Sequence, residues 1–245
     1  MDAVIFAGHG SRTGAGNLEF IDFIEMVMES MNTPIKAYSF YERAEPSIMQ
    51  AVETVVSQGA TEVTIIPVLL LPGIHANTGI PQEIERARAI YPEIVFKYGD
   101  AIGVDPVIID ILKDRLASKL YAHEGNEAVL LVSHGSPDPV AAIEMEAISC
   151  FLGEELGTKS VAGYLITPPY FHEKLAELQE QSFQKVYIIP YLLFAGSFQS
   201  EVEERIAAFE QLNSGMEFIF CDPIGYDERI KKLLIQRAEG AKQLQ

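Results

Sequence analysis

Short apolar runs alternate along the chain with longer stretches in which apolar residues recur every three or four positions. The short runs are rich in β-branched residues and are bounded by Gly, Pro or polar residues, as is typical of strands buried on both faces. The longer stretches have the periodicity of amphipathic helices. Strands are predicted over Ala3–Ala7, Ile35–Phe40, Glu62–Leu71, Ile94–Tyr98, Ala128–Ser133, Val161–Ile166, Lys185–Phe194 and Met216–Cys221. Helices are predicted over Asn17–Met31, Pro46–Gln58, Pro81–Ile90, Val104–Tyr121, Val140–Leu156, Phe171–Gln181, Glu201–Leu212 and Asp227–Glu239.

The strict alternation of predicted strands and helices indicates an α/β fold. Consecutive parallel strands are joined by right-handed helical crossovers, which place helices on both faces of a sheet. Three segments of the first half recur in the second half, in the same order and about 120 residues later. The pairs are Gly8-His9-Gly10-Ser11 with Ser133-His134-Gly135-Ser136, Ile65–Leu70 with Ile188–Leu193, and Asp100–Asp105 with Asp222–Asp227. We therefore predict two homologous α/β lobes of about four parallel strands each, at residues 1–122 and 127–245.

Composition and charge narrow the classes of partner. With 48% hydrophobic and 22% charged residues, the 245-residue chain can bury a sizeable core and is not disordered. Its 18 basic and 35 acidic residues give a formal net charge of −17, which disfavours nucleic acids and anionic membrane surfaces as partners. We expect no secretion signal or membrane anchor, because the N-terminus lacks a basic segment and the longest apolar stretch is shorter than the roughly 20 residues that span a bilayer. The two cysteines, Cys150 and Cys221, lie far apart, as in proteins of a reducing compartment, and a cytoplasmic location is expected.

Chemically capable side chains follow the first three predicted strands. His9 follows the first strand, Glu42 the second and His75 the third. In open α/β sheets, ligands bind outside the carboxyl ends of the strands, so these three side chains are expected to meet at one rim. Imidazole and carboxylate together suit a divalent first-row metal and also proton transfer near neutral pH. A lone loop histidine is more often an ordinary hydrogen-bonding residue, and Glu45 is expected only to stabilise the start of a helix at Pro46, but the convergence favours a functional site.

The second half of the chain provides an internal comparison. His134 occupies the place of His9, but Phe198 stands where His75 would be, and the segment around Ile166 has no counterpart of Glu42. The chemistry is therefore assigned to the N-terminal lobe, and the second lobe is expected to provide a wall and substrate contacts. The chain has no P-loop, no dinucleotide-binding glycine motif and no G-x-S-x-G nucleophile elbow, so nucleotide hydrolysis and serine hydrolase chemistry have no support.

The chain resembles the class II tetrapyrrole chelatases of the sirohydrochlorin chelatase type, the CbiX/SirB family, in the long form with two lobes. The motifs that carry the resemblance are Gly8-His9-Gly10-Ser11-Arg12, Tyr41-Glu42-Arg43-Ala44-Glu45-Pro46-Ser47 and Pro67-Val68-Leu69-Leu70-Leu71-Pro72-Gly73-Ile74-His75, with Ile80-Pro81 downstream. The resemblance implies two Rossmann-like lobes that face a common cleft, and insertion of a divalent metal into sirohydrochlorin without ATP. It implies that His9 and His75 are the metal-binding and catalytic pair and that Glu42 is the carboxylate that assists them. The metal is then a substrate, and no permanently bound cofactor is expected.

Substrate contacts and the choice of metal follow from the same resemblance. Sirohydrochlorin carries many carboxylates, so Arg12 and Arg43, which lie in the strand-end loops, are predicted to anchor its acidic arms. Ser11, Phe198 and His134 are predicted as further substrate contacts, and apolar positions such as Leu71, Ile74 and Phe194 as walls for the ring. Iron is favoured, because the segment 240–245 carries no His-rich or Cys-rich extension of the kind that cobalt-pathway members often have.

Other functions remain open from the sequence. Cobalt insertion for cobalamin biosynthesis is the nearest alternative to iron insertion for sirohaem biosynthesis, and related short enzymes use nickel. A non-catalytic tetrapyrrole or metal carrier could use the same cleft. A phosphatase of the histidine type is disfavoured, because such sites place an Arg directly before the histidine, where this chain has Gly8. We expect a monomer, since the short forms pair to build the cleft that two fused lobes already contain.

Overall fold

The computed structural model describes residues 1–11, 14–119, 121, 125–194, 196–212 and 215–243. The strands are β1 (Asp2–Gly8), β2 (Ile35–Phe40), β3 (Glu62–Pro67), β4 (Val95–Tyr98), β5 (Glu127–Ser133), β6 (Lys159–Tyr164), β7 (Lys185–Pro190), β8 (Glu217–Phe220) and β9 (Lys242–Gln243). The helices are α1 (Gly14–Glu29), α2 (Ile48–Ser57), the π-helix η1 (His75–Gly79), α3 (Ile80–Ile90), α4 (Pro106–Ala117), α5 (Pro139–Leu156), α6 (Phe171–Glu180), α7 (Gly196–Leu212) and α8 (Glu228–Gly240). The chain forms two compact units: unit 1 comprises Met1–Gly103 and Tyr226–Gln245, and unit 2 comprises Val104–Gly225.

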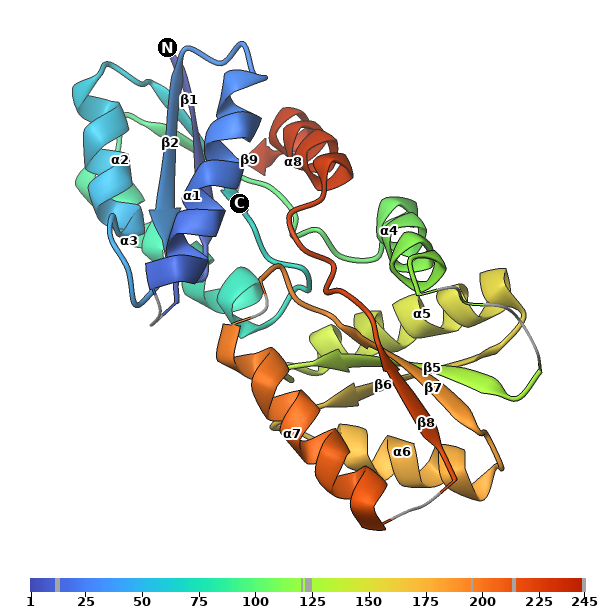
Figure 1. The fold of residues 1–245 in the computed structure, drawn as a ribbon. Coiled ribbons are helices and arrows are strands. Elements are labelled where there is room, and N and C mark those ends of the chain that lie inside the picture. The colour runs from blue at the N-terminus through green and yellow to red at the C-terminus, as the bar shows by residue number, and fades with distance from the viewer. Residues whose placement is uncertain (12–13, 120, 122–124, 195, 213–214, 244–245) are drawn as a thin grey trace. The chain divides into compact units, whose positions relative to one another are not determined.

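Unit 1 is built on a sheet with the strand order β2-β1-β3-β4, all parallel, and the short β9 pairs antiparallel with the outer edge of β4. Helices α1 and α8 pack together on one face, and α2 and α3 pack together on the other (Figure 1). The α2/α3 face covers a core in which Ala3, Ile5 and Ala7 of β1 are almost fully buried, while the intervening Val4 and Phe6 are buried on the opposite face. Burial on both faces explains why β1 is apolar at every position from Ala3 to Ala7.

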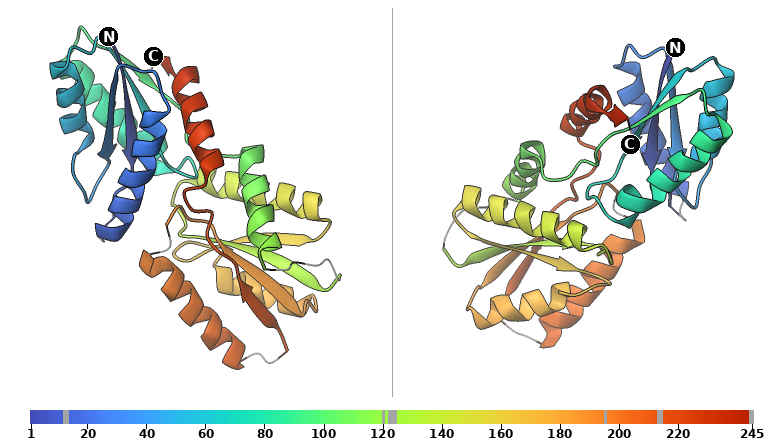
Figure 2. Two further views of the ribbon diagram at one scale, coloured as in Figure 1. Left: turned by 45° about the horizontal axis from the view of Figure 1, so that its top comes forward. Right: turned by 180° about the vertical axis from the view of Figure 1, so that it is seen from behind.

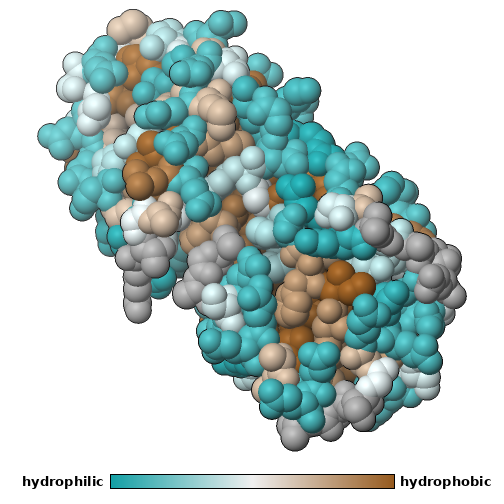
Figure 3. Space-filling view, viewed as in Figure 1, coloured by the Kyte–Doolittle hydropathy of each residue, from teal (hydrophilic) through white to brown (hydrophobic). Residues whose placement is uncertain are grey.

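Unit 2 repeats this architecture with the strand order β6-β5-β7-β8, all parallel. Helices α4 and α5 pack together, with α5 against β6 and α4 against β7, and α6 and α7 pack together over a second apolar core. The predicted fold class, two α/β lobes of four parallel strands with flanking helices, is confirmed. None of the helices within the described ranges combines the length and hydropathy needed to cross a bilayer. Hydrophilic side chains cover most of the face seen in Figure 3, as expected for a chain with this many charged residues.

The compact units differ from the predicted lobes, 1–122 and 127–245, in the placement of one helix each and of the short strand β9, which pairs with β4 of unit 1. Helix α4 follows β4 in the sequence but packs on α5 and β7 in unit 2, and α8 follows β8 but packs on α1 and β3 in unit 1. Figures 1 and 2 show α8 beside α1. The exchange occurs after Gly103 and Gly225, which have positive φ values of 66° and 68° and whose N–H groups donate to the carbonyls of Leu70 and Leu192. At both positions the chain turns away from its own sheet just after the fourth strand.

Two predicted strands are too long at their carboxyl ends. The strands predicted to end at Leu71 and Phe194 end instead at Pro67 and Pro190. The residues that follow stay apolar because they form a covered loop: the carbonyls of Leu69 and Leu70 accept hydrogen bonds from the 102–103 segment rather than from a neighbouring strand. A run of apolar residues therefore predicts that the segment is buried, but not that it pairs with a neighbouring strand.

Helix α2 begins two residues later than the sequence suggests. Ser47 is the N-cap, and it forms a capping box in which its hydroxyl accepts from the Gln50 N–H and the Gln50 side chain accepts from the Ser47 N–H. Pro46 therefore precedes the helix. The Glu45 carboxylate also accepts from the Ser47 N–H at 3.0 Å, so this carboxylate supports the start of the helix, as expected from its position.

Candidate metal centre

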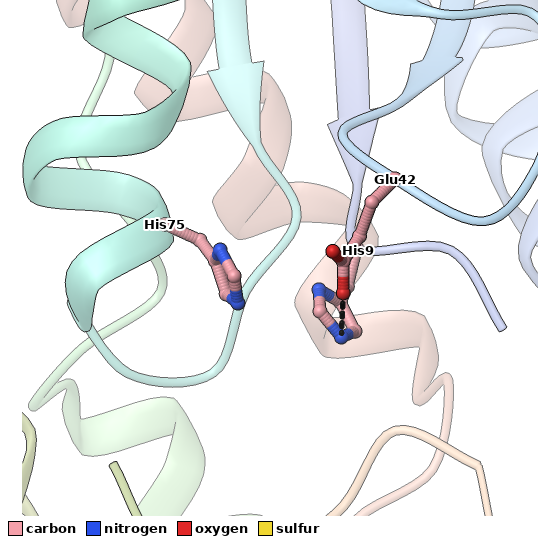
Figure 4. Close-up of side chains that lie close together, drawn as sticks. All are labelled: His9, Glu42 and His75. Atoms are coloured by element: carbon pink, nitrogen blue, oxygen red, sulfur yellow. Dashed lines mark ion pairs between the residues drawn. The ribbon is translucent and has the colours of Figure 1, made fainter. Parts of the chain in front are cut away.

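Three side chains from the carboxyl ends of neighbouring strands meet in unit 1. His9 follows β1, Glu42 follows β2 and His75 opens η1 after β3, and each offers one ligand atom within 4.8 Å of the other two. Figure 4 shows the two imidazoles pointing toward one another, with the Glu42 carboxylate above His9. The ring centroids of the histidines are 4.7 Å apart, and Nε2 of His9 lies 3.5 Å from Oε1 of Glu42. All three residues are half-buried, so the cluster is open to a small ligand.

Strand β1 lies between β2 and β3, and this order brings the three side chains together. The β1 and β2 ends stay paired beyond the strands, because Tyr41 N–H donates to the Gly8 carbonyl and Glu42 N–H donates to the His9 carbonyl. Gly10 turns away at φ 87°, and a Cβ at this position would lie 1.8 Å from the Glu42 carbonyl oxygen. Only glycine permits both this φ and this close approach. The turn thus fixes the backbone of Glu42 against the backbone of His9.

Arg43 is expected at this rim as a local cation, but its ion pair with Glu42 is not predicted from the sequence. Its backbone adopts the left-handed conformation, with φ 64°, and its Nε lies 2.9 Å from Oε1 of Glu42. Neighbours in an extended strand point to opposite faces, so the ion pair depends on this turn. The same carboxylate oxygen therefore faces an imidazole and a guanidinium.

The imidazole of His75 is kept in its neutral form. Burial lowers the pKa of His75 below its ordinary value, and the Arg43 guanidinium lowers that pKa further, while Glu42 opposes both by raising it. A neutral imidazole has a lone pair for a metal or a proton. At neutral pH the cluster therefore presents nitrogen and oxygen donors of the kind that first-row divalent metals take.

Unit 2 repeats the turn without the ligands. Ile166 N–H donates to the His134 carbonyl, which matches the bond from Glu42 to His9, so Ile166 takes the place of Glu42. The rings of His134 and Phe198 lie 6.0 Å apart, as the counterpart of the two histidines of unit 1. Among the described residues, the only cluster of three or more metal-capable side chains is His9, Glu42 and His75.

The remaining predicted site residues lie at or near these turns, with one exception. Ser11 is held through its backbone, since its N–H donates to the Asn17 side chain, and its carbonyl accepts from the Asn17 amide. Arg43 lies at the cluster, with its side chain 42% exposed. Phe198 and His134 lie in unit 2. Arg12 lies outside the described residues.

Comparison with known proteins places the sequence in a family. The model of the CbiX family matches residues 3–119 and 128–241. The chain is 35% identical over 237 residues to a sirohydrochlorin ferrochelatase of Priestia megaterium, covering 96% of this chain and 88% of that protein. It is 31% identical over 245 residues to a sirohydrochlorin cobaltochelatase of the same organism, covering 98% of this chain and 79% of that one. The structure of SirB from Bacillus subtilis with Fe3+ superposes with a TM-score of 0.87 at 30% identity, over 97% of this chain and 94% of that chain. On this evidence the chain belongs to the CbiX family.

Proposed function

We propose that this protein is a chelatase that inserts a divalent metal into sirohydrochlorin. The observation that carries the proposal is the His9, Glu42 and His75 cluster at the carboxyl ends of three adjacent strands. Relatives named sirohydrochlorin ferrochelatase and sirohydrochlorin cobaltochelatase, similar over nearly the whole chain, support the same reaction. Iron is the metal we favour, because the highest identity among these relatives is to a ferrochelatase. Cobalt is the second candidate, supported by the cobaltochelatase that matches 98% of the chain.

The residues of the cluster account for the steps of the reaction. Two N–H protons leave the ring nitrogens as the metal enters, so the products are the metallated ring and two protons. His9 and His75 hold the incoming metal through neutral imidazole nitrogens and accept the protons as the metal moves to the ring. Glu42 balances part of the positive charge of the metal and orients the His9 ring through the 3.5 Å contact.

Binding of an acidic tetrapyrrole calls for local cations on a chain of net charge −17. Arg43 is half-exposed, and its Nε is engaged with Glu42, which leaves its terminal nitrogens able to meet a substrate carboxylate. We assign the acidic arms to Arg43 and Arg12, and further contacts with the ring to Ser11, Phe198 and His134. The protein is expected to act as a cytoplasmic monomer without a resident cofactor or a nucleic-acid partner.

Substitution of the two histidines tests the proposal. His9→Ala and His75→Ala should each lower the rate of metal insertion by more than the roughly 10–100-fold that losing an outer partner of a metal ligand costs. His172→Ala is the matched control, because His172 is an exposed histidine of α6 that stacks on Tyr170. The rate is followed by the absorbance of the tetrapyrrole with Fe2+ or Co2+ in excess. Wild-type rates in both site variants would refute the proposal.

Catalysis and carriage are separated by stoichiometry. With protein well below the concentration of sirohydrochlorin and metal, an enzyme metallates many equivalents, whereas a carrier stops at one. The same mixture with Fe2+ and Co2+ in competition identifies the preferred metal. A plateau at one equivalent would show that the protein acts as a tetrapyrrole or metal carrier and not as a chelatase.

A further inference from the structure

The backbone that carries His75 is not an ordinary helical turn. His75 opens the π-helix η1, in which the Ile80 N–H donates to the His75 carbonyl, and α3 follows directly. Residue Ile74, which precedes the turn, has no side-chain capping bond. A π-turn is rare and less favourable than an α-turn, so contacts from outside the turn must stabilise it. Two tyrosines supply such contacts.

The ring of Tyr41 packs against both ends of the turn. Its centroid lies 4.8 Å from that of His75, with the two ring planes at 52°. A Cβ on Gly79, the last residue of η1, would lie 2.6 Å from the Cζ and hydroxyl oxygen of Tyr41. The absence of a side chain at Gly79 therefore makes room for the Tyr41 ring. One flat side chain thus touches the His75 imidazole and the backbone one turn further on.

The core anchors this arrangement. Tyr41 packs against the apolar cluster of unit 1 that includes Ile48 and Ile80, and Tyr98 at the end of β4 packs against the same cluster. The Tyr98 hydroxyl donates to the carbonyl of Ala76, the residue after His75, at 2.9 Å. The π-turn is therefore tied to β4 through its backbone and to the β2 loop through the Tyr41 ring.

We propose that Tyr41 is a positioning residue that, seated on Gly79, holds the His75 imidazole in the orientation that lets it share a metal with His9 and Glu42. This inference rests on the proposed function in that the metal is the one to be inserted. The contact with His75 is between the two rings, whereas the hydroxyl oxygen lies with Cζ against Gly79, so the ring is expected to carry the positioning of the imidazole. Loss of the ring frees the imidazole to rotate away from the other two ligands, which weakens the site for the metal before it affects the fold.

The test measures binding of Co2+ to the protein alone, from the visible absorption of the bound ion. Tyr41→Leu should raise the Kd for Co2+ by about 10–100-fold, the usual cost of losing an outer partner of a ligand. Tyr41→Phe should keep the wild-type Kd. Tyr38→Leu is the matched control, since Tyr38 lies three residues earlier, in β2, and its ring neighbours are Phe20 and Phe40. In turnover, the KM for the metal should rise in Tyr41→Leu while the KM for sirohydrochlorin stays the same.

Gly79→Ala provides a second test that leaves Tyr41 in place. The added methyl group should displace the Tyr41 ring and raise the Kd for Co2+, and it should have little further effect in Tyr41→Leu, where the ring is gone. A wild-type Kd in Tyr41→Leu or in Gly79→Ala would overturn the inference. Equal losses in Tyr41→Leu and Tyr38→Leu, or in Tyr41→Leu and Tyr41→Phe, would also overturn it. A wild-type protein that binds Co2+ but inserts no metal would refute the proposed function and leave this inference standing.

Discussion

At the scale of single residues, burial and two opposing charges set the proton affinity of His75. Burial lowers the pKa of His75, Glu42 raises it and Arg43 lowers it, with a net shift below the ordinary value. Arg43→Ala removes the repulsion of the imidazolium, so the pKa of His75 should rise. Glu42→Gln removes the attraction and leaves Arg43 unbalanced, so that pKa should fall. An NMR titration of the His75 ring proton measures both shifts directly.

The pH at which metal binding is lost on acidification should shift in the same direction as the pKa of His75 in each variant. Because a metal takes the neutral imidazole, binding is lost as the pH falls through the pKa of His75. Arg43→Ala should therefore lose the metal at a higher pH than the wild type does, and Glu42→Gln should keep the His75 part of the site competent to a lower pH. An unchanged acid limit in both variants would mean that burial alone controls the imidazole, and shifts of the same sign would contradict the opposing roles of the two charges.

The meeting of His9, Glu42 and His75 at one edge could be predicted from the sequence, but the surroundings of these side chains could not. His9, Glu42 and His75 follow apolar runs, and the carboxyl ends of parallel strands share one edge. The ion pair between Arg43 and Glu42 depends on the left-handed φ of Arg43, which no motif in the sequence predicts. The contact of Tyr41 with His75 likewise depends on a π-turn, and the apolar spacing near residue 80 predicts only a helix.

At the scale of elements, the glycine turn after β1 of unit 1 recurs after β5 of unit 2. Gly10 has φ 87° and Gly135 has φ 96°, and a Cβ on either would come within 2.4 Å of an atom of the facing loop. Unit 2 keeps this turn although Ile166 and Phe198 stand where unit 1 has the candidate ligands Glu42 and His75. The glycine is therefore required by the pairing of the two strand ends, and the candidate metal ligands depend on that pairing.

Gly10→Ala tests this dependence. The methyl group would clash with the Glu42 carbonyl, so the loop must move, and both stability and Co2+ affinity should fall. Gly157→Ala is the control, because Gly157 has φ 64° with no atom near its missing Cβ and should show only the conformational cost, on the order of 1 kcal/mol. Urea unfolding and Co2+ titration measure the two effects. A Gly10→Ala protein that matches Gly157→Ala in stability and retains wild-type affinity would show that the close approach is dispensable.

At the scale of the whole molecule, the repeat in sequence and the division into compact units are different. The sequence predicts eight alternating strands and helices and their duplication, because periodicity and repeated motifs are local signals. It cannot tell which sheet α4 and α8 cover, because each helix needs only an apolar partner and the two sheets offer equivalent faces. Arg115 of α4 donates to the carbonyls of Pro223 and Ile224, and Arg237 of α8 donates to the carbonyl of Ile102. These bonds hold α4 beside the segment that follows β8, and α8 beside the segment that follows β4.

Hydrogen exchange distinguishes the two divisions. The side chains of Leu234 in α8 and Leu116 in α4 are at most 1% exposed. Truncating such a leucine to alanine lowers the free energy of unfolding by about 2–5 kcal/mol. Because α8 packs on β3 and α4 packs on β7, Leu234→Ala should speed amide exchange in β3, and Leu116→Ala should speed it in β7. A division that followed the sequence repeat would give the reverse assignment, with Leu234→Ala opening β7. Equal acceleration of both strands in both variants would show that the two units unfold together, and the site in unit 1 would then depend on every helix of the chain and not on α8 in particular.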